Sequence, residues 1–201
     1  MFHHYYGIPN NAKYGEEFMS RFPILFQERS KPMNETCMCW GIECPLGWYH
    51  IIDQLCTVLE FYNIDIGKKY HLAIIAEQVK EKFGTLRFYF SIHNVNDEGV
   101  IDCETDYPDA MIQSDYLNML ACSAINEAEE LTEKTCADCG IPLTEENTVE
   151  TKGWITYICK GCDEKRQKKR QEWLDKQNDE KKKKKKKNKD DKSEDEPTKV
   201  D

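Results

Sequence analysis

Four cysteines in the last third of the chain have the spacing that most clearly indicates chemistry. Cys136 and Cys139 form one C-x-x-C pair, and Cys159 and Cys162 form a second pair after nineteen intervening residues. Two residues between ligands let both sulfurs of a pair point at one ion, so the four thiolates predict a tetrahedral zinc site. Iron in the same all-sulfur geometry is the alternative metal. A redox dithiol is a third interpretation, but the thioredoxin-like setting that would favour it is missing.

Such a four-thiolate site indicates a structural role. Four sulfur ligands fill the coordination sphere of zinc and leave no position for water or substrate. In zinc-finger peptides, sites of this kind contribute on the order of 10–16 kcal/mol of apparent binding free energy. Between the pairs, "NTVETKGWITYI" suggests strand, turn and strand. The sequence therefore predicts a structural zinc ribbon at 135–162.

A second group of cysteines has a less regular pattern. Cys37, Cys39 and Cys44 have C-x-C-x4-C spacing, and Cys56 follows on a stretch with helical apolar periodicity. This irregular spacing favours reduced, buried or unused thiols. A second metal site is the alternative.

Upstream of the zinc ribbon, the sequence has both helical and strand periodicities. Apolar residues recur at helical spacing in three segments: 16–26, interrupted at Pro23, 47–62 and 108–134. Residues 71–79 and 85–92 suggest two strands joined by "KEKFG", which predicts an antiparallel hairpin. A short strand is expected at 100–103.

These elements predict an α+β fold. An isolated hairpin is marginal in water, so the two longer helices should cover a small antiparallel sheet. We expect an α+β domain at 1–134, the four-cysteine zinc ribbon at 135–162 and a charged tail at 163–201. The tail should begin as a solvated helix to about residue 180 and then be disordered, because seven consecutive lysines bury no apolar surface.

Charge is unevenly distributed along the chain. Residues 1–135 contain 10 Lys and Arg against 21 Asp and Glu, whereas residues 163–201 contain 16 against 12. The basic segments of the tail favour salt-dependent, non-specific contact with nucleic acid. The acidic folded part opposes such contact, so nucleic-acid binding by the tail and the zinc ribbon is an alternative function.

The predicted hairpin turn is the best candidate for binding a small anionic ligand. Local positive charge, an arginine fork and a neighbouring aromatic ring suit a phosphate or carboxylate. The residues concerned are Lys80, Lys82, Arg87 and Tyr89. The alternative is a solvated turn whose cations pair with Glu77 and Glu81.

The sequence gives little support for catalysis. His50, His71 and His93 have no partner at a recognisable ligand or triad spacing. The segment "DCETDYPD" at 102–109 contains four carboxylates, including Asp102 and Glu104, which could bind a divalent cation. A metal-dependent hydrolase or nuclease is therefore an alternative, but the sequence favours a non-catalytic binding protein.

Several stretches resemble a family of small uncharacterised proteins of tailed phages and prophages that end in a zinc-ribbon-like four-cysteine motif. The stretches are "WGIEC" with "GWY", "VKEKFGTLRFY", "TCADCG" and "GWITYICKGC", and the similarity spans about residues 20–162. Pro45 and Leu46 depart from the Gly-Asp-Gly-Trp type sequence that is common in the family. The resemblance implies a phage context in a host cytoplasm and no mechanism. Together with the features above, we expect an accessory protein that binds a host or phage protein or a small anionic ligand.

Localisation is predicted from what the sequence lacks. No apolar run approaches the roughly 18–20 residues that span a bilayer, and the N-terminus does not resemble a secretory signal. Paired C-x-x-C motifs in a reducing compartment more often bind metal than form disulfides. We therefore expect a cytoplasmic protein that has no membrane partner.

Overall fold

The computed structural model describes residues 14–105, 110–151 and 153–190. The chain divides into two compact units, Met1–Cys159 and Lys160–Asp201, and each unit is described by itself. The first unit is an α+β structure that contains the small sheet, as predicted. The predicted domain limits stay predictions.

The first unit is built on a three-stranded sheet with the order β1-β2-β3. The long strands β2 (Leu72–Lys82) and β3 (Thr85–Asn94) pair antiparallel, which confirms the predicted hairpin. The short strand β1 (Ile42–Glu43) pairs parallel to β2 and is an addition to the small antiparallel sheet that the sequence predicts. Two residues are too few to show an alternating pattern in the sequence.

Among the described residues, the first half of β2 has no partner strand on its β1 side, and other groups satisfy its backbone there. The amide of Ala76 donates to the carbonyl of Leu25 at 2.8 Å. The side chain of Asn63 accepts from the amide of Ile74 at 2.7 Å and donates to its carbonyl at 3.0 Å. This edge is thereby covered, which removes a row of unpaired groups that could pair with another chain.

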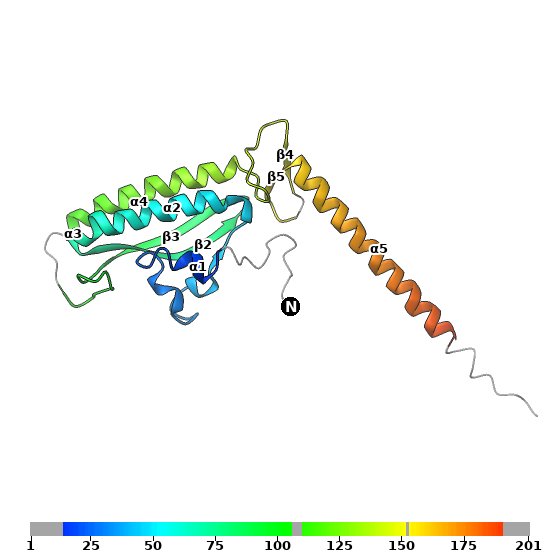
Figure 1. Cartoon of the computed structure of the whole chain (residues 1–201), viewed down its shortest axis with the longest axis horizontal. Helices are drawn as coiled ribbons and strands as arrows, with labels where there is room; N and C mark the ends of the chain where they lie inside the picture. The colour runs from blue at the N-terminus through cyan, green and yellow to red at the C-terminus, as the bar shows by residue number, and fades with distance from the viewer. Residues whose placement is uncertain (1–13, 106–109, 152, 191–201) are drawn as a thin grey trace, which may run out of the picture. The chain divides into compact units, whose positions relative to one another are not determined.

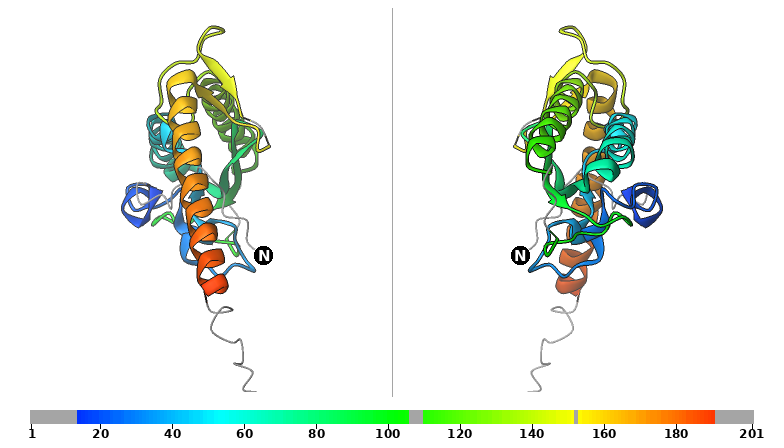
Figure 2. Two further views of the ribbon diagram at one scale, coloured as in Figure 1. Left: turned by 90° about the vertical axis from the view of Figure 1, so that its right-hand side faces the viewer. Right: turned by 90° about the vertical axis from the view of Figure 1, so that its left-hand side faces the viewer.

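Two helices pack side by side over one face of the sheet (Figure 1). They are α2 (Tyr49–Tyr62) and α4 (Ala110–Glu133), close to the predicted 47–62 and 108–134. Figure 2 shows the same layer along the helices. Three short elements flank α2: the 3-10 turn η4 (Leu46–Trp48), the π turn η5 (Asn63–Gly67) and the helical turn α3 (Lys68–Tyr70).

The N-terminal segment contains less helix than predicted. Helix α1 covers only Glu16–Met19, whereas the sequence suggests a helix over 16–26. The buried carboxylate of Glu60 on α2 accepts from the amides of Ile24 and Leu25 at 3.0 and 2.9 Å. These amides therefore bind a side chain instead of helix carbonyls. Two short 3-10 turns follow: η2 (Gln27–Ser30) and η3 (Met38–Trp40).

A small second core lies where this segment meets the loop after β3. It consists of Ile24, Ala73, Ile75, Val95 and Ile101. The strand predicted at 100–103 is reduced to one antiparallel bridge between Val95 and Ile101.

The predicted ribbon hairpin is present as the antiparallel strands β4 (Thr148–Glu150) and β5 (Tyr157–Cys159). The second unit begins with helix α5 (Lys160–Asp190), which continues past the predicted helix end near residue 180. Residues 181–190, where disorder is predicted, are therefore helical, and the rest of the predicted disordered stretch, 191–201, lies outside the described residues. In the described parts of the chain, no helix is long and apolar enough to cross a membrane.

Candidate metal centre

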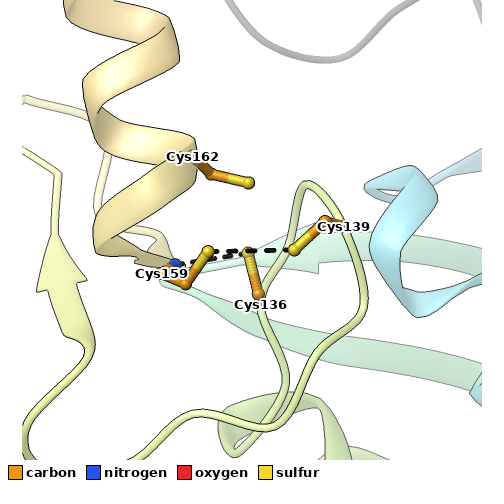
Figure 3. Close-up of side chains that lie close together, drawn as sticks. All are labelled: Cys136, Cys139, Cys159 and Cys162. Carbon is orange, nitrogen blue, oxygen red and sulfur yellow. Dashed lines mark hydrogen bonds between the residues drawn. The ribbon is translucent and has the colours of Figure 1, made fainter.

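The four cysteines predicted to bind metal come together in the structure (Figure 3). Cys136 and Cys139 lie in the turn that follows α4, Cys159 ends β5, and Cys162 is in the first turn of α5. All four sulfurs lie within 4.8 Å of one another, and the Cys139 and Cys159 sulfurs are 3.8 Å apart. A regular tetrahedron of thiolates about 2.3 Å from zinc would have sulfur–sulfur edges of about 3.8 Å. The donor set therefore fits a metal ion.

The turn around Cys136 also suits a thiolate ligand. Gly140 has φ of +78°, and its amide donates to the carbonyl of Cys136 at 2.9 Å, which closes the turn. Burial raises the pKa of Cys136, but hydrogen bonds from the amides of Cys159, Cys139 and Asp138 outweigh it, so the pKa lies below its ordinary value. Amides directed at a sulfur favour its anionic form, which is the form that binds metal.

The remaining cysteines do not join this site. Within 14–105, 110–151 and 153–190, the four cysteines above are the one group of three or more His, Cys, Asp or Glu side chains placed to hold a metal ion. The predicted alternative of a second site at Cys37, Cys39 and Cys44 therefore gains no support. Cys44 and Cys56 are buried, and burial raises the pKa of both thiols. These two cysteines pack as small apolar groups.

The cysteine turn is fixed to the start of α2 by backbone contacts. The amide of Gly47 donates to the carbonyl of Ala137 at 2.9 Å, and the indole of Trp48 donates to the carbonyl of Thr135 at 3.1 Å. A Cβ on Gly47 would lie 2.2 Å from the carbonyl oxygen of Cys136. Only glycine allows this approach without displacing the backbone.

The ribbon also contacts the β2–β3 turn. The buried carboxylate of Glu81 accepts from the amide of Gly84 at 2.7 Å and from the indole of Trp154. A Cβ on Gly84 would lie 2.7 Å from the ring of Tyr157. These supporting residues were not identified from the sequence. Gly47 and Trp48 belong to the "GWY" stretch, but nothing in the local sequence shows that this stretch meets "TCADCG".

The residues predicted to bind an anion have partners within the first unit. Arg87 forms an ion pair with Glu129 of α4 at 3.1 Å. Lys80 donates to the side chain of Gln78 at 2.6 Å and lies 5.4 Å from the ring centre of Tyr89. The remaining predicted residue, Lys82, is exposed at the end of β2.

A pocket of about 460 Å³ adjoins Tyr89, but its charge is negative. Its lining includes the carboxylates of Glu28, Glu35 and Glu77. Such a lining does not favour an anion. The ligand-binding assignment of the four turn residues stays a prediction.

The acidic segment 102–109, which was considered for catalysis, lies only in part within the described residues. Asp102 accepts from the amides of Glu104 and Thr105 at 3.0 and 3.2 Å, so it stabilises a local turn. The rest of the acidic segment, 106–109, lies outside the described residues. His93 lies 2.8 Å from the hydroxyl of Ser91.

The fold and the site define an α+β protein with a four-cysteine cluster that can hold a metal ion. No protein-family model, curated protein or solved structure matches the chain. The resemblance to phage proteins therefore stays an interpretation of the sequence.

Proposed function

We propose that this chain is a non-catalytic binding protein of the phage accessory type, and that its four cysteines hold a structural zinc ion. The observation that carries the proposal is the convergence of four sulfurs within 4.8 Å of one another. Zinc is favoured over iron because no redox step is needed for a site that only holds two segments together. The phage context rests on the sequence resemblance described above.

The buried charges of the first unit also suit a binding protein. Glu60 and Glu81 are buried, and both accept hydrogen bonds from backbone amides, so they serve the fold. We propose a protein as the partner instead of a small anion. Arg87 is already paired with Glu129, and the pocket beside Tyr89 is lined by acids.

Metal analysis of the purified chain tests the zinc assignment. We expect one zinc per chain by inductively coupled plasma mass spectrometry, and an intense sulfur-to-metal absorption band when cobalt replaces it. Cys159→Ser should abolish both signals, whereas Cys103→Ser, at an exposed cysteine outside the cluster, should preserve them. A chain that holds no metal and keeps its ribbon intact in a strong chelator would refute the proposal.

A second candidate function, non-specific binding of nucleic acid, is favoured by the charge of α5. This helix contains 15 Lys and Arg against 7 Asp and Glu, a net charge of +8. If α5 binds phosphates, the logarithm of the affinity for DNA should fall linearly with the logarithm of salt concentration. Replacing the lysines at 181–187 with glutamine should flatten this dependence. An unchanged slope would exclude the helix as the contact.

A further inference from the structure

The outer surface of the two-helix layer carries apolar side chains, although this surface faces solvent. Figure 1 shows α2 and α4 antiparallel, so the end of α2 lies beside the beginning of α4. Large apolar side chains on both helices are exposed there, from 37% for Val58 to 75% for Ile112. We call this surface the apolar helix face, and it consists of Val58, Phe61, Ile64, Ile112, Tyr116 and Met119.

This surface is also poor in charge. Between residues 110 and 126 of α4, Asp115 is the one charged residue. On α2 the two acids are Asp53, half-buried at the other end, and Glu60, which is buried. The exposed acid of η5 is Asp65, next to Ile64. Helices that face water normally carry charged side chains on that side. Depletion of charge around exposed aromatic and Met residues marks the core of a protein–protein interface.

We propose that the apolar helix face pairs with the same face of a second copy of this chain, which makes the protein a symmetric dimer. The available area suits a second copy. Half-exposed side chains of this size offer on the order of 100 Å² each, so the six offer on the order of 600 Å². This approaches the roughly 800 Å² that each partner contributes to a standard interface. It also lies at the upper end of the roughly 300–600 Å² that the largest apolar patch of a typical monomer covers.

The charges around the apolar helix face are arranged for self-pairing. Lys68 and Lys69 are exposed just beyond Ile64, at one end of the face. Glu127, Glu130 and Glu133 are exposed on α4 beyond the other end, where Lys134 lies 3.9 Å from Glu130 and leaves the end net acidic. In a two-fold interface the same patch meets itself in reverse. The basic end of one copy then lies against the acidic end of the other, while the apolar side chains meet at the centre.

This inference is independent of the proposed function. The apolar helix face contains no metal ligand, and its residues belong to α2, η5 and the first half of α4. A zinc-free result in the metal analysis would therefore leave the dimer untouched.

Sedimentation equilibrium of the full, metal-loaded chain tests the dimer. We expect twice the chain mass of 23.6 kDa. Phe61→Glu and Ile112→Glu should each weaken dimerisation about 30-fold or more, because each places a charge within the apolar helix face. Phe83→Glu is the matched control, since Phe83 is as exposed as Phe61 but lies at the β2–β3 turn. This control should remain a dimer.

A charge exchange keeps the test decisive if a glutamate variant fails to fold. Replacing Lys68 and Lys69 with glutamate should weaken the dimer, because acidic ends then face each other. Adding Glu127→Lys and Glu130→Lys to the same chain should restore it. A monomeric wild-type chain, a dimer that survives Phe61→Glu, or an exchange without restoration would each overturn the proposal.

Discussion

The zinc ribbon and the helix–sheet core of the first unit differ in what they bury. Among the described residues of the ribbon, the buried apolar side chains besides cysteines are Ala137 and Ile158. The core buries many large side chains completely, among them Trp48, Ile74 and Leu117. Burying one large apolar side chain contributes about 1.5–3 kcal/mol. The core can therefore fold on apolar burial, whereas the ribbon needs its sulfur ligands.

The two regions nevertheless share several hydrogen bonds. Gly47 and Trp48 bind the carbonyls of the cysteine turn, and Glu81 binds the indole of Trp154. The ribbon is therefore hydrogen-bonded to the core at these residues. The following predictions test how far the two regions depend on each other, from the largest expected effect to the smallest.

Removal of a metal ligand should have the largest effect. Cys136→Ser eliminates a buried sulfur that accepts amide hydrogen bonds, and with it the metal, whose binding in such sites is worth on the order of 10–16 kcal/mol. Hydrogen exchange should show loss of protection at 135–159 but retained protection in β2, β3 and α4. Loss of protection in both regions would show that ribbon and core unfold as one unit.

A pair of buried aliphatic side chains allows a direct comparison. Leu117→Ala in the core should lower the free energy of unfolding by about 2–5 kcal/mol, because it leaves a cavity in close packing. Ile158→Ala in the ribbon removes an equally buried side chain, but it should destabilise only the ribbon. Denaturant unfolding monitored by far-ultraviolet circular dichroism measures the loss of global stability in each variant. Equal losses of global stability would contradict the comparison.

The contact between the regions can be tested at one atom. Gly47→Ala places a Cβ only 2.2 Å from the backbone oxygen of Cys136. One of the two segments must therefore move. We expect a loss of about 1–3 kcal/mol, typical of overpacking, together with weaker metal retention in a chelator titration. Gly161→Ala is the control, because its added Cβ would lie within 4 Å of no atom beyond its chain neighbours and the backbone of its own helix. Unchanged metal retention in Gly47→Ala would mean that metal binding by the ribbon does not depend on its contact with η4.

Local patterns in the sequence predicted the parts of the fold whose partners lie nearby in the chain. The strict alternation at 85–92 predicted a strand, and the C-x-x-C spacing predicted the four-sulfur cluster. The position of the chain at Ile24 and Leu25 depends on Glu60, which lies 35 residues from Leu25. The close contact between the cysteine turn and η4 depends on Gly47. Such long-range hydrogen bonds leave no period in the sequence, so they could not be predicted.

The smallest predicted effect is a gain of stability at the β2–β3 turn. Phe83 and Gly84 both have positive φ, +54° and +81°, as in the type I′ turn that favours Asn-Gly. Phe83 is 61% exposed, so its ring contributes little packing, while a bulky residue in the left-handed region costs about 1–2 kcal/mol. Asn tolerates this region, and Phe83→Asn should therefore raise the free energy of unfolding by about 1 kcal/mol.

Thermal and denaturant unfolding of Phe83→Asn measure this gain, with Phe83→Ala as the control for loss of the ring. Alanine cannot form the local hydrogen bonds that help asparagine in this conformation, so it should gain less. The turn holds Glu81 and Gly84 against the ribbon, so the gain should also appear as slower loss of metal to a chelator. A stabilised core with unchanged metal loss would mean that the turn supports the hairpin alone, and that the two regions are joined only at Gly47 and Trp48.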